Sequence, residues 1–124
     1  MKFVETKKAP AAVGPYSQGV EAKGTLYVSG QIPFIPETMT LVGETIQEQT
    51  RQSLQNIKAI VEEAGYKVEN IVKCQVFLKD MNEFTYMNEV YEDFFKGHKP
   101  ARWAVEVARL PKDVKVEIDA ICVK

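Results

Sequence analysis

The chain has 124 residues, of which 45% are hydrophobic and 27% are charged, proportions that are ordinary for a globular protein. This length predicts one domain spanning residues 1–124, with about two thirds of the extended-chain surface buried around a single core. Lysine and arginine number 16 against 17 acidic residues, so no overall positive field would attract nucleic acid or an anionic membrane.

The N-terminal residues and the two cysteines predict the compartment. No apolar stretch near the N-terminus is long enough for a signal peptide or a membrane span, so we expect a cytoplasmic protein. Cys74 and Cys122 lie in apolar, strand-like runs, which favours buried free thiols over a disulfide and suits a reducing compartment.

The first half of the chain predicts strands followed by a helix. Turn residues separate two strand-like runs, prolines interrupt the pairing, and apolar residues then recur at helical spacing. The expected elements are a short strand near Phe3 and Val4, a hairpin of residues 16–22 and 25–30 turning at Lys23 and Gly24, a loop over residues 33–43, and a helix over residues 44–64 that ends at Gly65.

The second half predicts a strand, a helix and a final pair of strands. Residues 71–78 alternate, and Asp80 and Glu83 have the spacing of a capping box before a helix that ends near Phe95. Residues 102–108 and 114–122 alternate on either side of a turn at 110–113, which predicts a hairpin.

If those last two strands pair directly, Arg102 lies opposite about Ile121. Glu117 is then four residues along the strand, on the order of 13 Å away. A ligand that bridges Arg102 and Glu117, or a site shared between subunits, fits this separation better than direct contact.

The element order predicts an α+β fold, a two-layer sandwich with two helices on one face of a mixed sheet. Apolar residues occur on both faces of the last strands, as in Trp103, Val105 and Val107 against Ala104 and Ala108. We therefore expect the face without helices to be covered by another chain.

Several kinds of catalytic site are excluded by composition. A single histidine, His98, provides neither a Ser-His-Asp triad nor a multi-histidine metal site, and the cysteines lack CxxC spacing. No glycine motif that cradles phosphate is present, nor an aromatic and basic platform for RNA. A catalyst built from this chain would use arginine, carboxylates, tyrosine, serine, backbone groups and water.

Dispersed motifs, in order along nearly the whole chain, resemble the RidA (YjgF) family of enamine/imine deaminases. They are APAAVGPYSQGV (9–20), VSGQIP (28–33), RQSLQNIKAIVEEAG (51–65), VKCQVFLKDMNEF (72–84), and PAR followed by VEVARLPKDVKVEIDAI in residues 100–121. The resemblance implies a chorismate-mutase-like fold, a homotrimer with sites at subunit interfaces, and no metal or organic cofactor.

The resemblance also implies roles for two charged residues. Arg102 would grip the substrate carboxylate, since a guanidinium binds a carboxylate bidentately. Glu117 would orient and deprotonate the attacking water, with Asp119 on the same strand face as its local competitor.

Five further residues match pocket positions of the family or lie beside them. Tyr16 either closes over the ligand or packs against Pro15, and Ser29 and Gly30 either bind the acid's oxygens or form an ordinary strand end. Asn88, which interrupts the apolar stripe of the second helix, either ties down a neighbouring backbone or reaches the pocket. Ala104 would line the substrate pocket, where a cysteine is common in bacterial members.

Three departures from the family pattern accompany these matches. The loop at residues 97–100 is shorter than usual, Trp103 stands where smaller residues are usual, and Met39 replaces a turn glycine. Alternation points Trp103 away from Arg102, so we interpret it as an interface or core residue.

The function implied is hydrolysis of short-chain 2-imino acids, such as 2-iminobutanoate and 2-iminopropanoate or their enamine tautomers, to 2-keto acids and ammonia. Two alternatives stay open. One is a non-catalytic regulator that binds a small carboxylate and reports it to a partner protein. The other, disfavoured by the near-neutral charge, is the ribonuclease or translation-inhibitor activity ascribed to some relatives.

Overall fold

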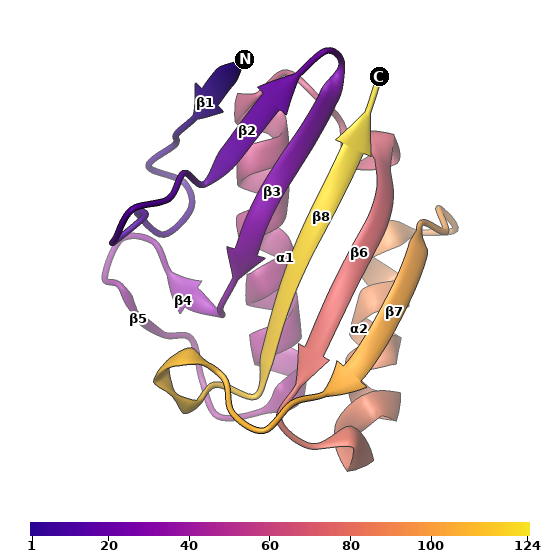
Figure 1. Ribbon diagram of the computed structural model, residues 1–124. Coiled ribbons are helices and arrows are strands. Elements are labelled where there is room, and N and C mark those ends of the chain that lie inside the picture. The colour runs from indigo at the N-terminus through magenta and orange to yellow at the C-terminus, as the bar shows by residue number, and fades with distance from the viewer.

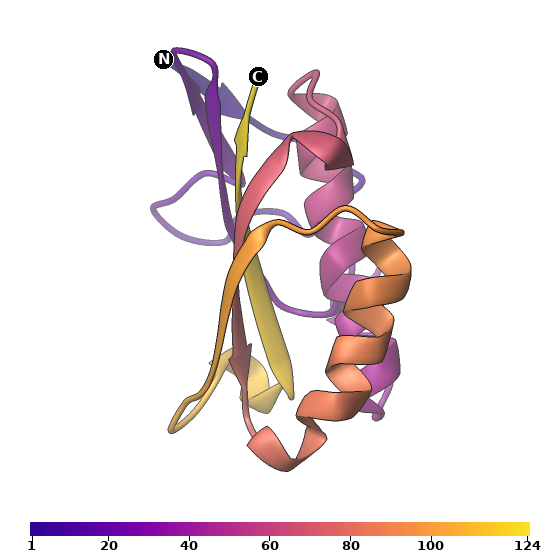
Figure 2. The same ribbon diagram turned by 90° about the vertical axis from the view of Figure 1, so that its right-hand side faces the viewer.

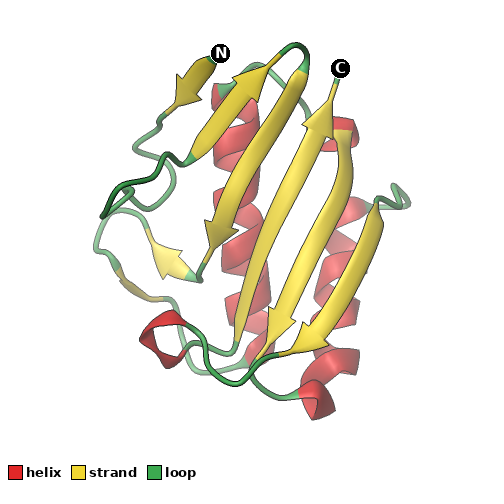
Figure 3. Ribbon diagram, viewed as in Figure 1, coloured by secondary structure: helices red, strands yellow, loops and turns green.

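A computed structural model describes residues 1–124 and contains one six-stranded mixed sheet, a small two-stranded sheet and two α-helices (Figures 1 and 3). The large sheet has the strand order β1-β2-β3-β8-β6-β7. The elements are β1 (Lys2–Val4), β2 (Gly19–Ala22), β3 (Thr25–Gln31), β4 (Phe34–Ile35), β5 (Thr40–Leu41), α1 (Ile46–Glu63), β6 (Ile71–Leu78), α2 (Phe84–Phe95), β7 (Ala101–Glu106) and β8 (Val116–Val123), with 3₁₀ turns η1 (Val68–Asn70), η2 (Met81–Glu83) and η3 (Pro111–Asp113).

Both helices cover the same face of the sheet, which confirms the predicted α+β sandwich with its helices on one side (Figure 2). The core lies between these two layers. Along β8 the side chains that face the helices are all buried, namely Val116, Ile118, Ala120 and Cys122. The thiols of Cys74 and Cys122 are free and buried, as expected.

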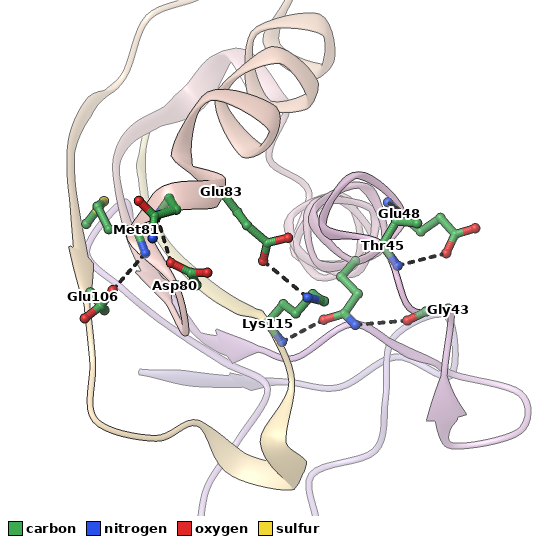
Figure 4. Close-up of polar contacts among 10 residues, drawn as sticks. Gly43, Thr45, Glu48, Asp80, Met81, Glu83, Glu106 and Lys115 are labelled. Carbon is green, nitrogen blue, oxygen red and sulfur yellow. Dashed lines mark hydrogen bonds and ion pairs between the residues drawn. The ribbon is translucent and has the colours of Figure 1, made fainter.

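The predicted first helix is confirmed, and its beginning is fixed by a capping box. Thr45 accepts a hydrogen bond from the Glu48 backbone N–H, and the Glu48 carboxylate accepts one from the Thr45 backbone (Figure 4). Gly65, with a φ of 82°, follows the last helical turn as predicted. Neither α1 nor α2 is long and apolar enough to cross a lipid bilayer.

The predicted capping box at the second helix is wrong. Asp80 accepts a hydrogen bond from the Asn82 backbone and so caps the short η2 turn, while the Glu83 carboxylate binds the Lys115 ammonium (Figure 4). The helix proper begins one turn later, at Phe84.

Two loop predictions need correction. Residues 33–43 contain the small hairpin of β4 and β5, whereas residues 16–18 of the predicted strand lie outside β2. Met39, in the β4–β5 turn, has a φ of 57°. This left-handed conformation explains why a glycine is usual there in the family that the sequence resembles.

The predicted C-terminal hairpin is wrong. β7 and β8 do not pair with each other, because β6 lies between them, parallel to β7 and antiparallel to β8. Arg102 is therefore paired with Cys74 rather than with Ile121. The connection at η3 carries the chain across β6 and includes Lys112 and Asp113 at positive φ.

The sheet face opposite the helices is uncovered (Figure 2). Large side chains on it are about half exposed, with Tyr27 at 52%, Trp103 at 49% and Val123 at 45%. We call this surface the open face of the sheet.

Candidate functional site

Arg102 is held against α2, on the helix side of the sheet. Its Nη1 donates a hydrogen bond of 2.7 Å to Asn88 Oδ1. Its guanidinium carbon lies 4.7 Å from the ring centroid of Tyr91 and 5.4 Å from that of Phe84, distances typical of cation–π contacts. The guanidinium makes no other hydrogen bond within the chain, so its remaining N–H groups are available for a ligand.

Asn88 does not tie down a neighbouring backbone, because its side-chain oxygen accepts from Arg102 and its side chain makes no hydrogen bond to a backbone group. Spacing along α2 explains the arrangement. Phe84, Asn88 and Tyr91 follow one another at intervals of four and three residues, which places all three on one helix face. That face presents an amide and two rings to the edge strand β7.

Glu117 lies on the open face of the sheet. It is paired with Phe77 on β6, and its carboxylate lies against β3 at Gly30. A Cβ atom at Gly30 would stand 2.5 Å from Glu117 Oε2, so the absence of a side chain there makes room for the carboxylate. Burial, followed by the neighbouring negative charge of Asp119, raises the pKa of Glu117.

Ser29 and Gly30 occupy an irregularity in the β3–β8 pairing, between Val28 and Gln31. The Ser29 hydroxyl donates to the Ser17 carbonyl at 2.5 Å, and the Ser29 backbone N–H donates to the Gln18 carbonyl. Ser29 thus ties the loop before β2 to the end of β3. Its hydroxyl retains only lone pairs for another partner.

Tyr16 and Ala104 lie apart from these contacts. The Tyr16 side chain is 54% exposed, its hydroxyl makes no hydrogen bond within the chain, and no contact links it to Arg102 or Glu117. Ala104 lies two residues after Arg102 on the same strand face, paired with Val76 and packed against the core.

The candidate residues therefore form two groups on opposite faces of the sheet. Arg102 shares its face with its buried register partner Cys74 and with Asn88 of α2, whereas Glu117 and Gly30 meet on the open face. Strand β6 lies between β7 and β8. One chain does not bring Arg102 and Glu117 together, and the predicted separation along a hairpin does not apply.

Sequence reasoning missed two features of these groups. The first is the pair of rings, Phe84 and Tyr91, beside Arg102. Both rings belong to the apolar stripe of the second helix, which indicated only a role in the core. The second is Gln75 on β6, which links Trp103 to Asp119 across the open face. Alternation places Gln75 on that face, but only the registers of β6 with β7 and of β6 with β8 identify its neighbours.

No group of three or more histidine, cysteine, aspartate or glutamate side chains is arranged to hold a metal ion. A surface hollow of about 720 Å³ lies between α1 and the C-terminal end of α2, and it includes none of the candidate residues.

Comparison with known proteins gives consistent matches over the whole chain. Residues 6–124 match the family described as endoribonuclease L-PSP. A 2-iminobutanoate/2-iminopropanoate deaminase of Salmonella typhimurium is 56% identical, over 99% of this chain and 98% of the relative. A RutC family protein of Pyrococcus horikoshii is 55% identical, over 99% of this chain and 98% of the relative. The crystal structure of Escherichia coli TdcF with bound serine has a TM-score of 0.96 and 50% identity, and covers 100% of this chain and 99% of that one.

Proposed function

This chain belongs to the RidA (YjgF) family, whose sequence profile is described as endoribonuclease L-PSP, and from that premise we propose that it is an imine deaminase. It hydrolyses short-chain 2-imino acids, or their enamine tautomers, to 2-keto acids and ammonia. The name of the Salmonella relative supports the reaction. The serine bound by TdcF supports the ligand class, because serine, like a 2-imino acid, carries its nitrogen on the carbon that bears the carboxylate.

The observation that carries the proposal is the arrangement of Arg102. Asn88 accepts a hydrogen bond from Nη1, and the rings of Tyr91 and Phe84 lie beside the guanidinium. The position of the guanidinium is therefore set before a ligand binds. A carboxylate that binds the remaining N–H groups bidentately would be held in one plane. This orients the adjacent imine carbon and supplies part of the rate by positioning alone.

Glu117 supplies the proton chemistry. Its carboxylate takes a proton from water while the water oxygen bonds to the carbon of the protonated imine, whose π electrons move to nitrogen and leave it a neutral amine. Glu117 then returns this proton to the nitrogen of the resulting carbinolamine. The Glu117 carboxylate next takes the hydroxyl proton, the carbon–oxygen double bond forms, and the carbon–nitrogen bond breaks to release ammonia. An iminium carbon is electrophilic on its own, so this scheme needs no cofactor.

A complete site requires two copies of the chain, because Arg102 and Glu117 lie on opposite faces of one sheet. We assign Arg102 to one subunit and Glu117 to the next. The half-exposed Tyr27 and Trp103 support this assembly, since they provide an apolar surface for a neighbouring copy. A homotrimer with three such interfaces closes by rotation and contains three equivalent sites.

The test couples a threonine dehydratase to this protein and follows keto-acid formation while semicarbazide competes for the released imine. We expect acceleration by the wild type, loss of nearly all acceleration in Arg102→Ala, and little change in Arg51→Ala. The last is a matched control, because Arg51 forms an exposed ion pair with Asp93.

A folded wild-type protein that binds 2-keto acids but gives no acceleration would contradict the deaminase and favour the regulator. RNA cleavage that survives in Arg102→Ala and Glu117→Gln would favour a nuclease.

A further inference from the structure

A hydrogen-bonded row of side chains crosses the open face from the edge strand to the centre of the sheet. Trp103 of β7, Gln75 of β6 and Asp119 of β8 are aligned by the register of the three strands. With the Gln75 amide assigned so that its oxygen faces Trp103, the Trp103 indole N–H donates to that oxygen at 2.9 Å and the Gln75 side-chain nitrogen donates to Asp119 Oδ2 at 2.7 Å. The Gln75 backbone N–H donates to Asp119 Oδ1 at 3.0 Å.

This row fixes the Asp119 carboxylate. An indole N–H can only donate, so it sets the Gln75 amide with its oxygen toward Trp103 and its nitrogen toward Asp119. Each Asp119 oxygen then receives one hydrogen bond, and both bonds come from the same residue. Because the backbone and the side chain of Gln75 each bind one Asp119 oxygen, the carboxylate has little freedom to rotate.

Glu117 lies two residues from Asp119 on the same strand face, about 6.6 Å along β8. The other charged or titratable side chains on this face are Lys73 of β6 and Tyr27 of β3, and β7 contributes none. Both Lys73 and Tyr27 pair with Ile121, which is beyond Asp119 as seen from Glu117. Lys115, two residues before Glu117, is bound to Glu83 at the start of α2, so within one chain Asp119 is the charge that acts on Glu117 across the open face.

We propose that Gln75 and Trp103 are positioning residues that hold the Asp119 carboxylate beside Glu117, so that its charge sets how strongly Glu117 binds the proton taken from water. This inference rests on the proposed function of Glu117 as the base. It gives a role to Trp103, which the sequence alone indicated to be an interface or core residue.

The direction of the effect follows from like charges. A second negative charge nearby disfavours ionised Glu117 and raises its pKa, in addition to the effect of burial. A carboxylate with a higher pKa is a stronger base toward water. If Asp119 were free to turn away from Glu117, the distance between the two charges would grow and the coupling would weaken.

The first experiment follows the Glu117 side-chain carboxyl by ¹³C NMR through a pH titration of the whole protein, which requires no catalysis. In Asp119→Asn we expect the Glu117 midpoint to fall by about 0.5–1 pH unit. Asp93→Asn removes the same unit of charge from a distant surface pair and is expected to leave the midpoint unchanged. An unchanged midpoint in Asp119→Asn would overturn the proposal.

The second experiment separates Asp119 from the residues that hold it. Gln75→Leu removes the amide that orients Asp119, and it is expected to lower the Glu117 midpoint by a smaller amount than Asp119→Asn. The double variant is expected to match Asp119→Asn alone, because both changes act through one charge. A wild-type midpoint in folded Gln75→Leu would remove Gln75 and Trp103 from the mechanism.

The third readout is the pH dependence of keto-acid formation. Its acid limb is expected to move to lower pH in Asp119→Asn and in Trp103→Phe, which keeps an aromatic ring but removes the N–H donor. An NMR shift in a protein without deaminase activity would support the charge coupling and refute the proposed reaction. An acid limb that stays in place in an active Asp119→Asn would refute the coupling.

Discussion

At the scale of single residues, the contact between Gly30 and Glu117 shows how the absence of a side chain leaves room for the proposed catalytic carboxylate. The sequence left two interpretations of Gly30, binding of the acid's oxygens or an ordinary strand end. The structure provides a different reason for glycine, because a side chain there would meet the Glu117 carboxylate. The backbone at Gly30 is not in the left-handed region, so space rather than conformation restricts this position.

Gly30→Ala is therefore expected to displace Glu117 without unfolding the protein. The coupled dehydratase assay should show a rate lowered by at least about tenfold, since small displacements of a catalytic group are costly. Circular dichroism and thermal melting should remain close to the wild type. A full rate in Gly30→Ala would mean that the Glu117 carboxylate works in another position.

Glu117 is also expected to reduce stability at neutral pH. Its pKa is raised in the folded state, so the stability it contributes is fully present below its unfolded pKa and is lost as pH rises through its folded pKa. Glu117→Gln removes the ionised form, and its melting temperature at pH 7 should exceed that of the wild type by a few degrees. The difference should disappear near pH 3, where the carboxyl of the wild type is protonated. A higher melting temperature for wild type at pH 7 would contradict this account.

At the scale of elements, periodicity predicted what each segment is but not which segment lies beside it. The first helix and the β2–β3 hairpin were predicted correctly because their signals are local. The pairing of β7 with β8 was predicted wrongly, because alternation defines two faces of a strand and leaves its neighbours open. The distance between Arg102 and Glu117 depended on that pairing, so it was wrong as well.

The residues of the candidate site were more predictable than their arrangement. Motifs that resemble a family make Arg102 and Glu117 candidates, and the alternation correctly pointed Trp103 away from Arg102. The partners of these residues come from other strands and from α2. No short-range pattern in the sequence links Gln75 to Trp103, because that contact depends on a parallel register formed across a helix.

The β4–β5 turn offers a prediction at this scale. Met39 adopts a left-handed backbone conformation, which costs about 1 kcal/mol for a residue with a side chain. Met39→Gly should remove this strain, partly offset by the greater entropy of the unfolded chain. We expect the free energy of unfolding in urea to stay the same or rise by up to about 1 kcal/mol. Met39→Val should lower it, because a β-branched residue tolerates this conformation poorly.

At the scale of the whole molecule, the two faces of the sheet decide where a complete site can form. Each chain offers Arg102 on one face and Glu117 on the other. In a ring of identical copies, the arginine of one subunit can meet the glutamate of the next. In the proposed reaction, subunit contact would then be a condition for activity.

Mixing two inactive variants tests this arrangement. Arg102→Ala and Glu117→Gln should each be inactive alone. When equal amounts are unfolded together and refolded, about one quarter of the sites should pair an intact arginine with an intact glutamate and recover activity. A site formed within one chain would give no recovery, and a monomer by light scattering would also exclude a shared site.

The position of β8 has a consequence for synthesis of the protein. It is a central strand, between β3 and β6, yet it follows every other strand in the chain. Until a ribosome has released β8, β3 and β6 each present an unpaired edge, and the two parts of the sheet have no strand to join them. Nascent chains that stall before Val116 should therefore be caught by chaperones or aggregate, while release of the last segment closes the sheet in one step.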